Sequence, residues 1–260
     1  MKDRILLFIP AYNCEKQIVR VLSSLSEDVL KYFKEVIVVN NRSTDGTEEA
    51  AVTFAAEHAS LPLRVLRNHS NYGLGGSHKV AFSYAAENGF DYVVVLHGDA
   101  QGNIRDFLPM LRRGIYRRYD CVLGARFMRG SRLRGYSLIR TAGNVVYDFL
   151  FAFVTGRRIF DLGSGLNMYS VSMLRDRFYE KFPDGLTFNY CMVMALSYYD
   201  QKARFYPISW TETDQVSNVK MGRQALNVLK MLFDFWHNPA SLEGDYREEP
   251  VEEYGAEPVN

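Results

Sequence analysis

Three side chains that can ligate a metal or hold phosphate-bound water stand two residues apart near the middle of the chain: His97, Asp99 and Gln101. They directly follow the apolar, β-branched run Val93–Leu96, which predicts a strand buried on both faces of a parallel sheet. Such a strand delivers the residues after it to the carboxyl edge of the sheet, where open α/β sheets bind ligands. The segment therefore indicates a metal or phosphate site, and an ordinary polar turn formed by Gly98 and Asp99 is the alternative interpretation.

The elements that must position this segment alternate regularly in the first half of the chain. Strands are predicted at Ile5–Ile9, Val36–Val39, Leu63–Leu66, Tyr92–Leu96 and Cys121–Gly124. Helices are predicted between them, at Glu15–Lys31, from Thr44 or Asp45 to His58, through Val80–Ala85 and at Ile104–Arg117. This alternation predicts the α/β class, with a mostly parallel, doubly wound sheet, right-handed crossovers and helices on both faces.

Four of these strands end in polar or glycine-rich segments, PAYN, NNRSTDG, NYGLGG and HGDAQG. A parallel sheet gathers such segments along one edge, which is the arrangement of a nucleotide site. Pro10, Tyr12 and Asn13 would frame the base, with a plain strand-end turn as the alternative. Gly73 and Gly75 permit close backbone approach and can offer N–H groups to an anion, with a simple loop-to-helix cap as the alternative.

The second half of the chain is less regular. Helices are predicted at Thr141–Thr155, Val171–Phe182, Leu186–Tyr199 and Met221–Trp236, with a strand at Arg204–Trp210. The last helix is amphipathic, and it suits a membrane surface as well as packing on its own domain. We expect one domain over residues 1–240, with a nucleotide-binding half at about 1–125 and an acceptor half at about 126–240. Residues 241–260 are acidic and interrupted by proline, which predicts a disordered tail.

Composition excludes several classes of protein. The 260 residues are 47% hydrophobic and 14% aromatic, enough for a sizeable core, and the net charge of +1 gives no indication of nucleic-acid binding. The three scattered cysteines form no CxxC pair, so neither a disulfide framework nor a zinc site is indicated. The apolar start Ile5–Ile9 is too short for a signal peptide, and no stretch approaches the roughly 18 uninterrupted apolar residues of a membrane span. We therefore expect a cytoplasmic protein, either soluble or peripheral at the membrane.

One segment of the second half is strongly one-sided in charge. Between Cys121 and Tyr147 there is no acidic residue, and there are five arginines: Arg126, Arg129, Arg132, Arg134 and Arg140. A run of charge is usually a solvated face, but this composition favours anion binding. Arginine suits phosphates because its guanidinium presents a fixed fork of donors.

Together, the motifs resemble those of the family 2 glycosyltransferases of the GT-A fold, and most closely the dolichyl- and polyprenyl-phosphate sugar synthases, among them the dolichol-phosphate mannose synthases. The Asp-x-Asp-x-Gln metal motif of that subgroup reads here His97-Gly-Asp99-Ala-Gln101. The Gly-Ser-Arg motif of the subgroup has its counterpart in Gly124-Ala-Arg126, and the arginine downstream of it in Arg140. The Asp-x-x-Ser-Gly motif corresponds to Asp161-Leu-Gly-Ser164-Gly165, and the late Ser-Lys segment to Ser217-Asn-Val-Lys220. The resemblance covers about residues 4–222.

The resemblance implies a divalent metal, Mn²⁺ or Mg²⁺, held by Asp99 with Gln101 and His97 as supporting ligands. It also implies that Arg126 and Arg140 hold the acceptor and donor phosphates. Further contacts to the nucleotide-sugar would come from Asn40, Asn41, Lys79 and Lys220, in addition to the first strand end and the glycine-rich loop.

Two departures from the subgroup remove negative charge near the nucleotide. His97 replaces the first carboxylate of the metal motif, and Asn40-Asn41 replaces an Asp-Asp pair. Asparagine keeps hydrogen bonds to a base or ribose, and histidine still binds a divalent metal while shifting the preference from magnesium toward manganese. A core or turn histidine and a catalytically silent homologue are the alternatives that these departures leave open.

The acceptor is predicted from a missing base. A hydroxyl acceptor needs a base near its proton, and the acidic pair that many family 2 members carry late in the domain has no counterpart in Phe182–Tyr190, although Asp161 and Asp184 remain candidates. A lipid phosphate is already anionic and needs arginines instead. We therefore predict an inverting, metal-dependent transfer of a hexose from a GDP- or UDP-sugar to a polyprenyl or dolichyl phosphate at the membrane surface. The alternatives are a hydroxyl acceptor or a silent nucleotide-binding protein. A separate membrane protein and a second copy of the chain are further partners left open.

Overall fold

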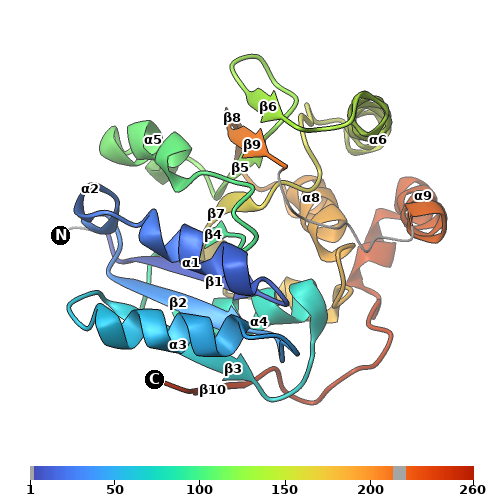
Figure 1. Cartoon of the computed structure of the whole chain (residues 1–260). Coiled ribbons are helices and arrows are strands. Elements are labelled where there is room, and N and C mark those ends of the chain that lie inside the picture. The colour runs from blue at the N-terminus through green and yellow to red at the C-terminus, as the bar shows by residue number, and fades with distance from the viewer. Residues whose placement is uncertain (1–2, 213–220) are drawn as a thin grey trace.

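The computed structural model describes residues 3–212 and 221–260 and has one large mixed sheet with helices on both faces (Figure 1). Over the described residues the strand order is β10-β3-β2-β1-β4-β7-β5-β8. These strands are β1 (Ile5–Ala11), β2 (Glu35–Asn40), β3 (Leu63–Asn68), β4 (Tyr92–Leu96), β5 (Cys121–Ala125), β7 (Leu166–Ser170), β8 (Ala203–Pro207) and β10 (Ala256–Pro258). Two short strands, β6 (Arg132–Arg134) and β9 (Ser209–Thr211), form a separate parallel pair.

The sheet is parallel where strands and helices alternate in the sequence, and mixed beyond that. β3, β2, β1 and β4 are parallel neighbours, whereas β7 is antiparallel and lies between β4 and β5. After β5 the chain stays at the carboxyl edge, where it forms β6 and α6 (Leu138–Thr155). β7 therefore enters the sheet from that edge and must run in the opposite direction, which brings the residues before it next to the end of β4.

Alternate side chains of the central strands enter two hydrophobic cores. Leu7 and Val38 belong to the core under α1 (Glu15–Ser23), α3 (Thr47–Glu57) and α5 (Leu108–Arg112). Phe8 and Val39 belong to the opposite core, which α4 (Gly73–Glu87), α8 (Phe188–Tyr198) and α9 (Met221–His237) cover. The remaining helical elements are α2 (Glu27–Leu30), α7 (Val171–Leu174), η1 (Ile104–Phe107), η2 (Ile115–Arg118), η3 (Phe178–Lys181) and η4 (Pro239–Glu243).

Three of the predicted helices are broken. The helix predicted at Glu15–Lys31 divides into α1 and α2, the one predicted at Ile104–Arg117 into η1, α5 and η2, and the one predicted at Val171–Phe182 into α7 and η3. At the first break, Ser24 Oγ donates a hydrogen bond of 2.6 Å to the carbonyl of Val21. Such a side-chain bond to the backbone competes with continuation of a helix.

The tail predicted to be disordered is instead ordered. β10 pairs antiparallel with β3, with Ala256 opposite Asn68, and η4 precedes it. The hydroxyl of Tyr254 donates to Asp184 Oδ1 at 2.7 Å, so the tail also contacts the α4–α8 face. The prediction from charge is wrong because an edge strand offers unpaired backbone groups to any extended segment. The acidic side chains of the tail stay exposed and do not oppose this pairing.

Candidate functional site

The carboxyl ends of β1, β2 and β4 meet at one edge of the sheet, and each contains a strained residue. Asn13, Arg42 and Ala100 follow these strands with φ angles of 48°, 60° and 59°. Non-glycine residues with such positive φ angles are uncommon and cluster at functional sites. The backbone N–H of Gly98 donates to the carbonyl of Pro10 at 3.0 Å and joins the β1 and β4 ends. This edge is therefore the best candidate for a ligand site.

The loop after β1 is tied to the loop after β2. The backbone N–H of Asn13 donates to Ser43 Oγ at 3.0 Å, and Asn13 Oδ1 accepts from the N–H of Thr44 at 2.8 Å. Tyr12 is 49% exposed beside these bonds. A half-exposed aromatic ring at this edge can stack on a nucleotide base, so the role predicted for Tyr12 stays a prediction that the geometry permits.

Asn40 and Asn41 are buried, and their side chains order the surrounding loops. Asn41 Oδ1 accepts from Asn68 Nδ2 at 2.9 Å and from the N–H of Tyr72 at 2.8 Å. Asn40 Nδ2 donates to Glu48 at 2.6 Å. Because these amides are engaged inside the protein, the structure places them as supports beneath the predicted nucleotide site.

The glycine-rich loop approaches another part of the protein more closely than the sequence analysis expects. A Cβ on Gly73 would lie 2.5 Å from the carbonyl oxygen of Asp184, and one on Gly75 would lie 2.4 Å from that of Pro183. The N–H of Gly75 donates to the Asp184 carbonyl at 2.6 Å. The close approach therefore serves the 183–185 segment, and this N–H is not available to an anion.

Lys79 does not occupy the position predicted for a nucleotide-sugar ligand. It is 1% exposed, and its Nζ donates to Asp184 Oδ1 and to the carbonyl of Phe182, both at 2.6 Å. The ring of Tyr254 lies 4.5 Å from Nζ. Burial lowers the pKa of Lys79, while the ion pair with Asp184 opposes this shift. Through these contacts Lys79 connects its own helix, α4, to the segment before α8 and to the C-terminal tail.

The predicted metal motif is assembled at the end of β4. The backbone N–H of His97 donates to the carbonyl of Gly165 at 2.9 Å. The side-chain Nδ1 of His97 lies 4.0 Å from Asp99 Oδ2. Asp99 Oδ1 accepts from the N–H of Gln101 at 3.0 Å. Burial raises the pKa of Asp99 to about 6, and burial together with the charge of Arg126 lowers the pKa of His97 to about 4. The imidazole is therefore neutral near pH 7 and has a lone pair to offer.

This donor set fits a metal that is shared with a phosphate ligand. Among residues 3–212 and 221–260, no group of three or more His, Cys, Asp or Glu side chains is placed to hold a metal ion. His97 and Asp99 supply two donors, and the buried Nε2 of His97 has no partner among the same residues. Magnesium in phosphate sites is usually held by one or two carboxylates plus phosphate oxygens and water. The residues therefore fit a cation that a diphosphate helps to hold.

Arg126 and Asp161 form a buried, bidentate ion pair. Arg126 Nε and Nη2 donate to the two Asp161 oxygens at 2.7 and 2.8 Å, and the backbone N–H of Arg126 donates to the same carboxylate at 2.8 Å. The guanidinium carbon also lies 5.0 Å from the ring centres of Phe127 and Trp210. Asp161 therefore orients Arg126, and a carboxylate with these three bonds is poorly placed to act as a base.

Arg140 stands at the start of α6 and is also paired. Its Nη1 donates to Glu212 at 2.8 Å, and its guanidinium lies 4.6 Å from the ring centre of Tyr136. Arg126 lies 5.6 Å from the same ring, so Tyr136 is packed between the two predicted phosphate-binding arginines. The structure thus brings Arg126 and Arg140 together around one aromatic side chain.

One carboxyl group near Arg126, that of Asp148, is not among the residues predicted for the site. Asp148 is 6% exposed, and its Oδ1 has no hydrogen-bond partner in the described part of the chain. Burial, reinforced by the charge of Asp161 and opposed by Arg126, raises the pKa of Asp148 to about 8. A signal was present in the sequence, because Asp148 is the only acidic residue of the apolar segment Leu138–Thr155.

Most of the large apolar side chains of α6 are exposed, whereas Asp148 is buried and Phe151 enters the core. The exposed apolar residues of α6 and the neighbouring α9 are 37–85% exposed; we call them the α6–α9 surface, formed by Leu138, Ile139, Val145, Val146, Phe149, Phe153, Leu226, Leu229, Phe233 and Trp236. The rings of Phe153 and Trp236 lie 6.3 Å apart, which makes the surface continuous across the two helices. In the described residues, α6 is the one helix long and apolar enough to span a membrane, although only 17% of it is buried in the protein. The sequence predicts no membrane span here, because polar residues interrupt the apolar segment.

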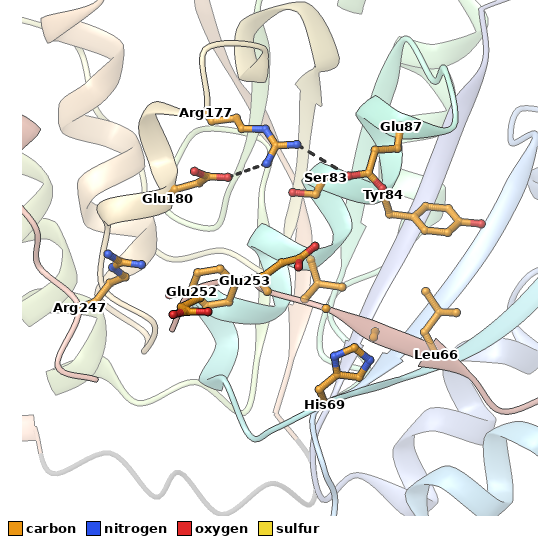
Figure 2. A pocket seen from close by; sticks show the side chains of 14 residues that line it. Leu66, His69, Ser83, Tyr84, Glu87, Arg177, Glu180, Arg247, Glu252 and Glu253 are labelled. Atoms are coloured by element: carbon orange, nitrogen blue, oxygen red, sulfur yellow. Dashed lines mark hydrogen bonds and ion pairs between the residues drawn. The ribbon is translucent and has the colours of Figure 1, made fainter. Parts of the chain in front are cut away.

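A cavity of about 380 Å³ lies beneath the tail, on the α4 side of the sheet (Figure 2). Three of its charged side chains pair with one another, because Arg177 contacts Glu180 at 3.0 Å and Glu87 at 3.8 Å. None of the residues predicted to bind nucleotide, phosphate or metal lines it. The predicted residue Lys220 and the neighbouring Ser217 lie outside the described residues.

The mixed sheet with helices on both faces is that of the GT-A fold. Solved structures of glucosyl-3-phosphoglycerate synthase from Mycobacterium tuberculosis have this fold, and one of them contains Mn²⁺, UDP-glucose and glycerol 3-phosphate. The latter aligns with a TM-score of 0.61 and 16% identity, over 88% of this chain and 80% of that chain.

The family model described as glycosyl transferase family 2 matches residues 7–178, and the chain belongs to this family. An undecaprenyl-phosphate mannosyltransferase from Micrococcus luteus is 30% identical over 173 residues, 66% of this chain and 68% of that protein. A UDP-N-acetylglucosamine–dolichyl-phosphate N-acetylglucosaminyltransferase from Methanococcus voltae is 25% identical over 186 residues, 67% of this chain and 73% of that protein. The chain thus spans about two thirds of the length of such relatives.

Proposed function

We propose that the protein transfers a hexose from a nucleotide-sugar to a polyprenyl phosphate at a membrane surface, with inversion at the anomeric carbon. The observation that carries the acceptor is the α6–α9 surface. Arg140 lies in the first turn of α6, and β6, which precedes this helix in the chain, has the exposed arginines Arg132 and Arg134. Apolar side chains next to basic ones are the pattern of a helix that lies in the interface of an anionic membrane. The two similar proteins named for lipid-phosphate acceptors support the same choice.

The inner side of α6 suits the phosphate of such an acceptor. Arg140, Asn144 and Asp148 follow one another at a spacing of four residues and share one helix face. Asn144 Nδ2 donates to the hydroxyl of Tyr136 at 2.9 Å, and Tyr136 packs on Arg126. A lipid whose chain follows the outer face of α6 can therefore present its phosphate to the polar residues behind it.

The donor would bind at the carboxyl edge of β1, β2 and β4. Tyr12 would stack on the base, and Asp99, His97 and Gln101 would hold a Mn²⁺ or Mg²⁺ ion. When bound, such a metal neutralises the charge of the leaving diphosphate. Arg126 lies close enough to this motif to influence the pKa of His97, so acceptor and donor sites adjoin.

The chemistry needs no protein base. A phosphate oxygen of the acceptor attacks the anomeric carbon from the side opposite the diphosphate, a C–O bond forms, and the bond to the nucleotide diphosphate breaks. Both carboxylates that the sequence analysis considers as bases are occupied, since Asp161 binds Arg126 and Asp184 binds Lys79 and Tyr254. Their engagement favours an acceptor that is already anionic.

The test is a panel of radiolabelled UDP- and GDP-sugars with polyprenyl phosphate and Mn²⁺, scored for label that extracts with the lipid. We expect lipid-linked label from one donor and a large loss in Asp99→Ala. We expect no change in Asp176→Asn, an exposed acid that lies after α7, beyond the end of β7 that pairs with the start of β4. Label on soluble saccharides alone would establish the hydroxyl acceptor instead. Absence of binding to every donor in calorimetry would establish a silent homologue.

Membrane docking is tested separately by vesicle flotation. Phe149 and Phe153 are 70% and 67% exposed on the α6–α9 surface, so Phe149→Ser/Phe153→Ser removes apolar area without opening the core. We expect the wild type to float with vesicles that contain anionic lipid and the double variant to remain in solution. Equal flotation of the two proteins would show that this surface does not bind membranes.

A further inference from the structure

Asp148 and Trp210 are two buried side chains near Arg126, and each has a polar atom to which no described residue is bonded. Asp148 is 6% exposed and Trp210 is 4% exposed. Neither Asp148 Oδ1 nor Trp210 Nε1 has a hydrogen-bond partner within residues 3–212 and 221–260. Buried polar atoms are nearly always paired, and an exception needs a cause such as a ligand that completes them.

The two residues approach Arg126 from different elements. The Trp210 ring, on β9, lies 5.0 Å from the Arg126 guanidinium carbon. Asp148, on α6, is close enough to Arg126 and Asp161 for both charges to influence its carboxyl group. Tyr190 on α8 is also close enough to Arg126, Asp161 and Asp148 for their charges to influence the pKa of its hydroxyl group. Side chains from three elements, β9, α6 and α8, therefore surround Arg126 and form one polar region.

The charges of this region decide which ligand it can hold. Arg126 is paired with Asp161, and Arg140 is paired with Glu212. Burial raises the pKa of Tyr190 to about 12 and also raises that of Tyr147, so both phenols are neutral. The hydroxyl of Tyr147 donates to the carbonyl of Ala225 on α9. An ionised Asp148 would therefore give the region a net negative charge, whereas a protonated one leaves it neutral.

We propose that Asp148 carries a proton in the active enzyme and donates a hydrogen bond to the phosphate of the acceptor, with the Trp210 indole N–H as a second donor. The inference rests on the proposed function, because only an anionic acceptor calls for two further donors. The pKa of Asp148, about 8, agrees with a carboxyl group that keeps its proton at neutral pH. A bound phosphate would stabilise that proton further, since a like charge disfavours ionisation.

The proposal distinguishes a donor from a base. A carboxyl group that donates can be replaced by an amide, which keeps an N–H at the same position, but not by alanine. A carboxylate that removes a proton from a hydroxyl cannot be replaced by either. The KM and kcat values of Asp148→Asn and Asp148→Ala therefore distinguish a hydrogen-bond donor from a base. Asp176→Asn is the matched control on the surface.

The experiment measures KM for polyprenyl phosphate and kcat between pH 6 and 9.5, with the donor that labels the lipid in the wild type. We expect the wild-type KM to rise about tenfold per pH unit above about pH 8, where Asp148 loses its proton. Asp148→Asn should keep KM near the wild-type value at pH 7 and lose this rise. Asp148→Ala should raise KM by about 10- to 100-fold, as expected for a lost hydrogen bond to a charged group, with kcat little changed.

Infrared difference spectra provide a readout that does not depend on turnover. Adding polyprenyl phosphate to the wild type should shift the carbonyl band of a protonated carboxyl group, and Asp148→Asn should lack this band. Thermal unfolding checks that each variant is folded. A loss of kcat at normal KM in Asp148→Asn would identify a base and overturn the proposal, as would variants that all match the wild type. A wild type that labels no lipid phosphate would overturn the proposed function and the role of Asp148 with it.

Discussion

Substituting Asp161 by asparagine should destabilise the protein strongly, because it removes the only anion bonded to a buried guanidinium in the described structure. Arg126 and Asp161 are 7% and 3% exposed, and three hydrogen bonds of 2.7–2.8 Å join them. The amide that replaces the carboxylate is not charged and cannot accept all of these bonds. Breaking a buried ion pair by removing one partner costs about 3–5 kcal/mol. That is a large part of the roughly 5–15 kcal/mol that stabilises a typical domain.

The assay is urea unfolding of wild type, Asp161→Asn, Arg126→Met and the double variant Arg126→Met/Asp161→Asn at pH 7. Both single variants leave one buried charge without its partner, whereas the double variant removes both charges. The double variant should therefore be more stable than Asp161→Asn, which gives a large coupling energy in the double-mutant cycle. A loss below about 1 kcal/mol in Asp161→Asn, with the double variant the least stable, would refute the reasoning. Full stability together with complete loss of transfer would restore Asp161 as a candidate base.

Three further predictions concern the loops, the tail and the buried acid. Gly75→Ala should lower the free energy of unfolding in urea by about 1–3 kcal/mol, because its Cβ would lie 2.4 Å from the Pro183 carbonyl oxygen. Gly143→Ala, whose Cβ would have nothing within 4 Å, should raise it by about 1 kcal/mol. Equal effects of the two substitutions would contradict the close approach at Gly75. Tyr254→Phe should speed amide hydrogen exchange in β10, since it removes a hydroxyl bonded to Asp184 and Lys79, and unchanged exchange would show that these bonds do not hold the tail. In the folded chain the pKa of Asp148 is raised to about 8 from its ordinary 3.8, so between these values only the unfolded chain loses the proton. As the pH rises from 5 to 7, the free energy of unfolding of the wild type should therefore fall by about 1.4 kcal/mol per pH unit relative to that of Asp148→Asn. Parallel curves of unfolding free energy against pH for the two proteins would rule out a raised pKa.

The residues of the predicted metal motif show which features of the site the local sequence pattern can predict. A short β-branched run followed by His97, Asp99 and Gln101 predicts a strand end with ligands, and the structure places these residues at that position. The strand positions follow from the same local signals, because a buried strand is continuous in sequence. The organisation of the sheet beyond β4 does not follow, since β7 pairs with a strand that is distant in the sequence, with Ser170 opposite Tyr92.

Lys79 and the glycine-rich loop show where pattern fails. The loop has the composition of an anion site, but its closest neighbours come from residues 183–185, which lie far later in the chain. The tail has the composition of a disordered segment, but β3 offers it an edge to pair with. In each case the partner is distant in sequence, and composition carries no information about which distant segment will arrive.

The sequence by itself determined the family, the alternating elements and the order of the chemical groups along the chain, because these depend on residue type and local spacing. Only the tertiary structure decided which groups are free to act. It pairs Asp161 with Arg126 and encloses Lys79, while Asp148 keeps an oxygen without a partner in the described residues. It also turns the apolar face of α6 outward, beside α9. Burial and pairing depend on what packs against a side chain, and that is a property of the folded chain as a whole.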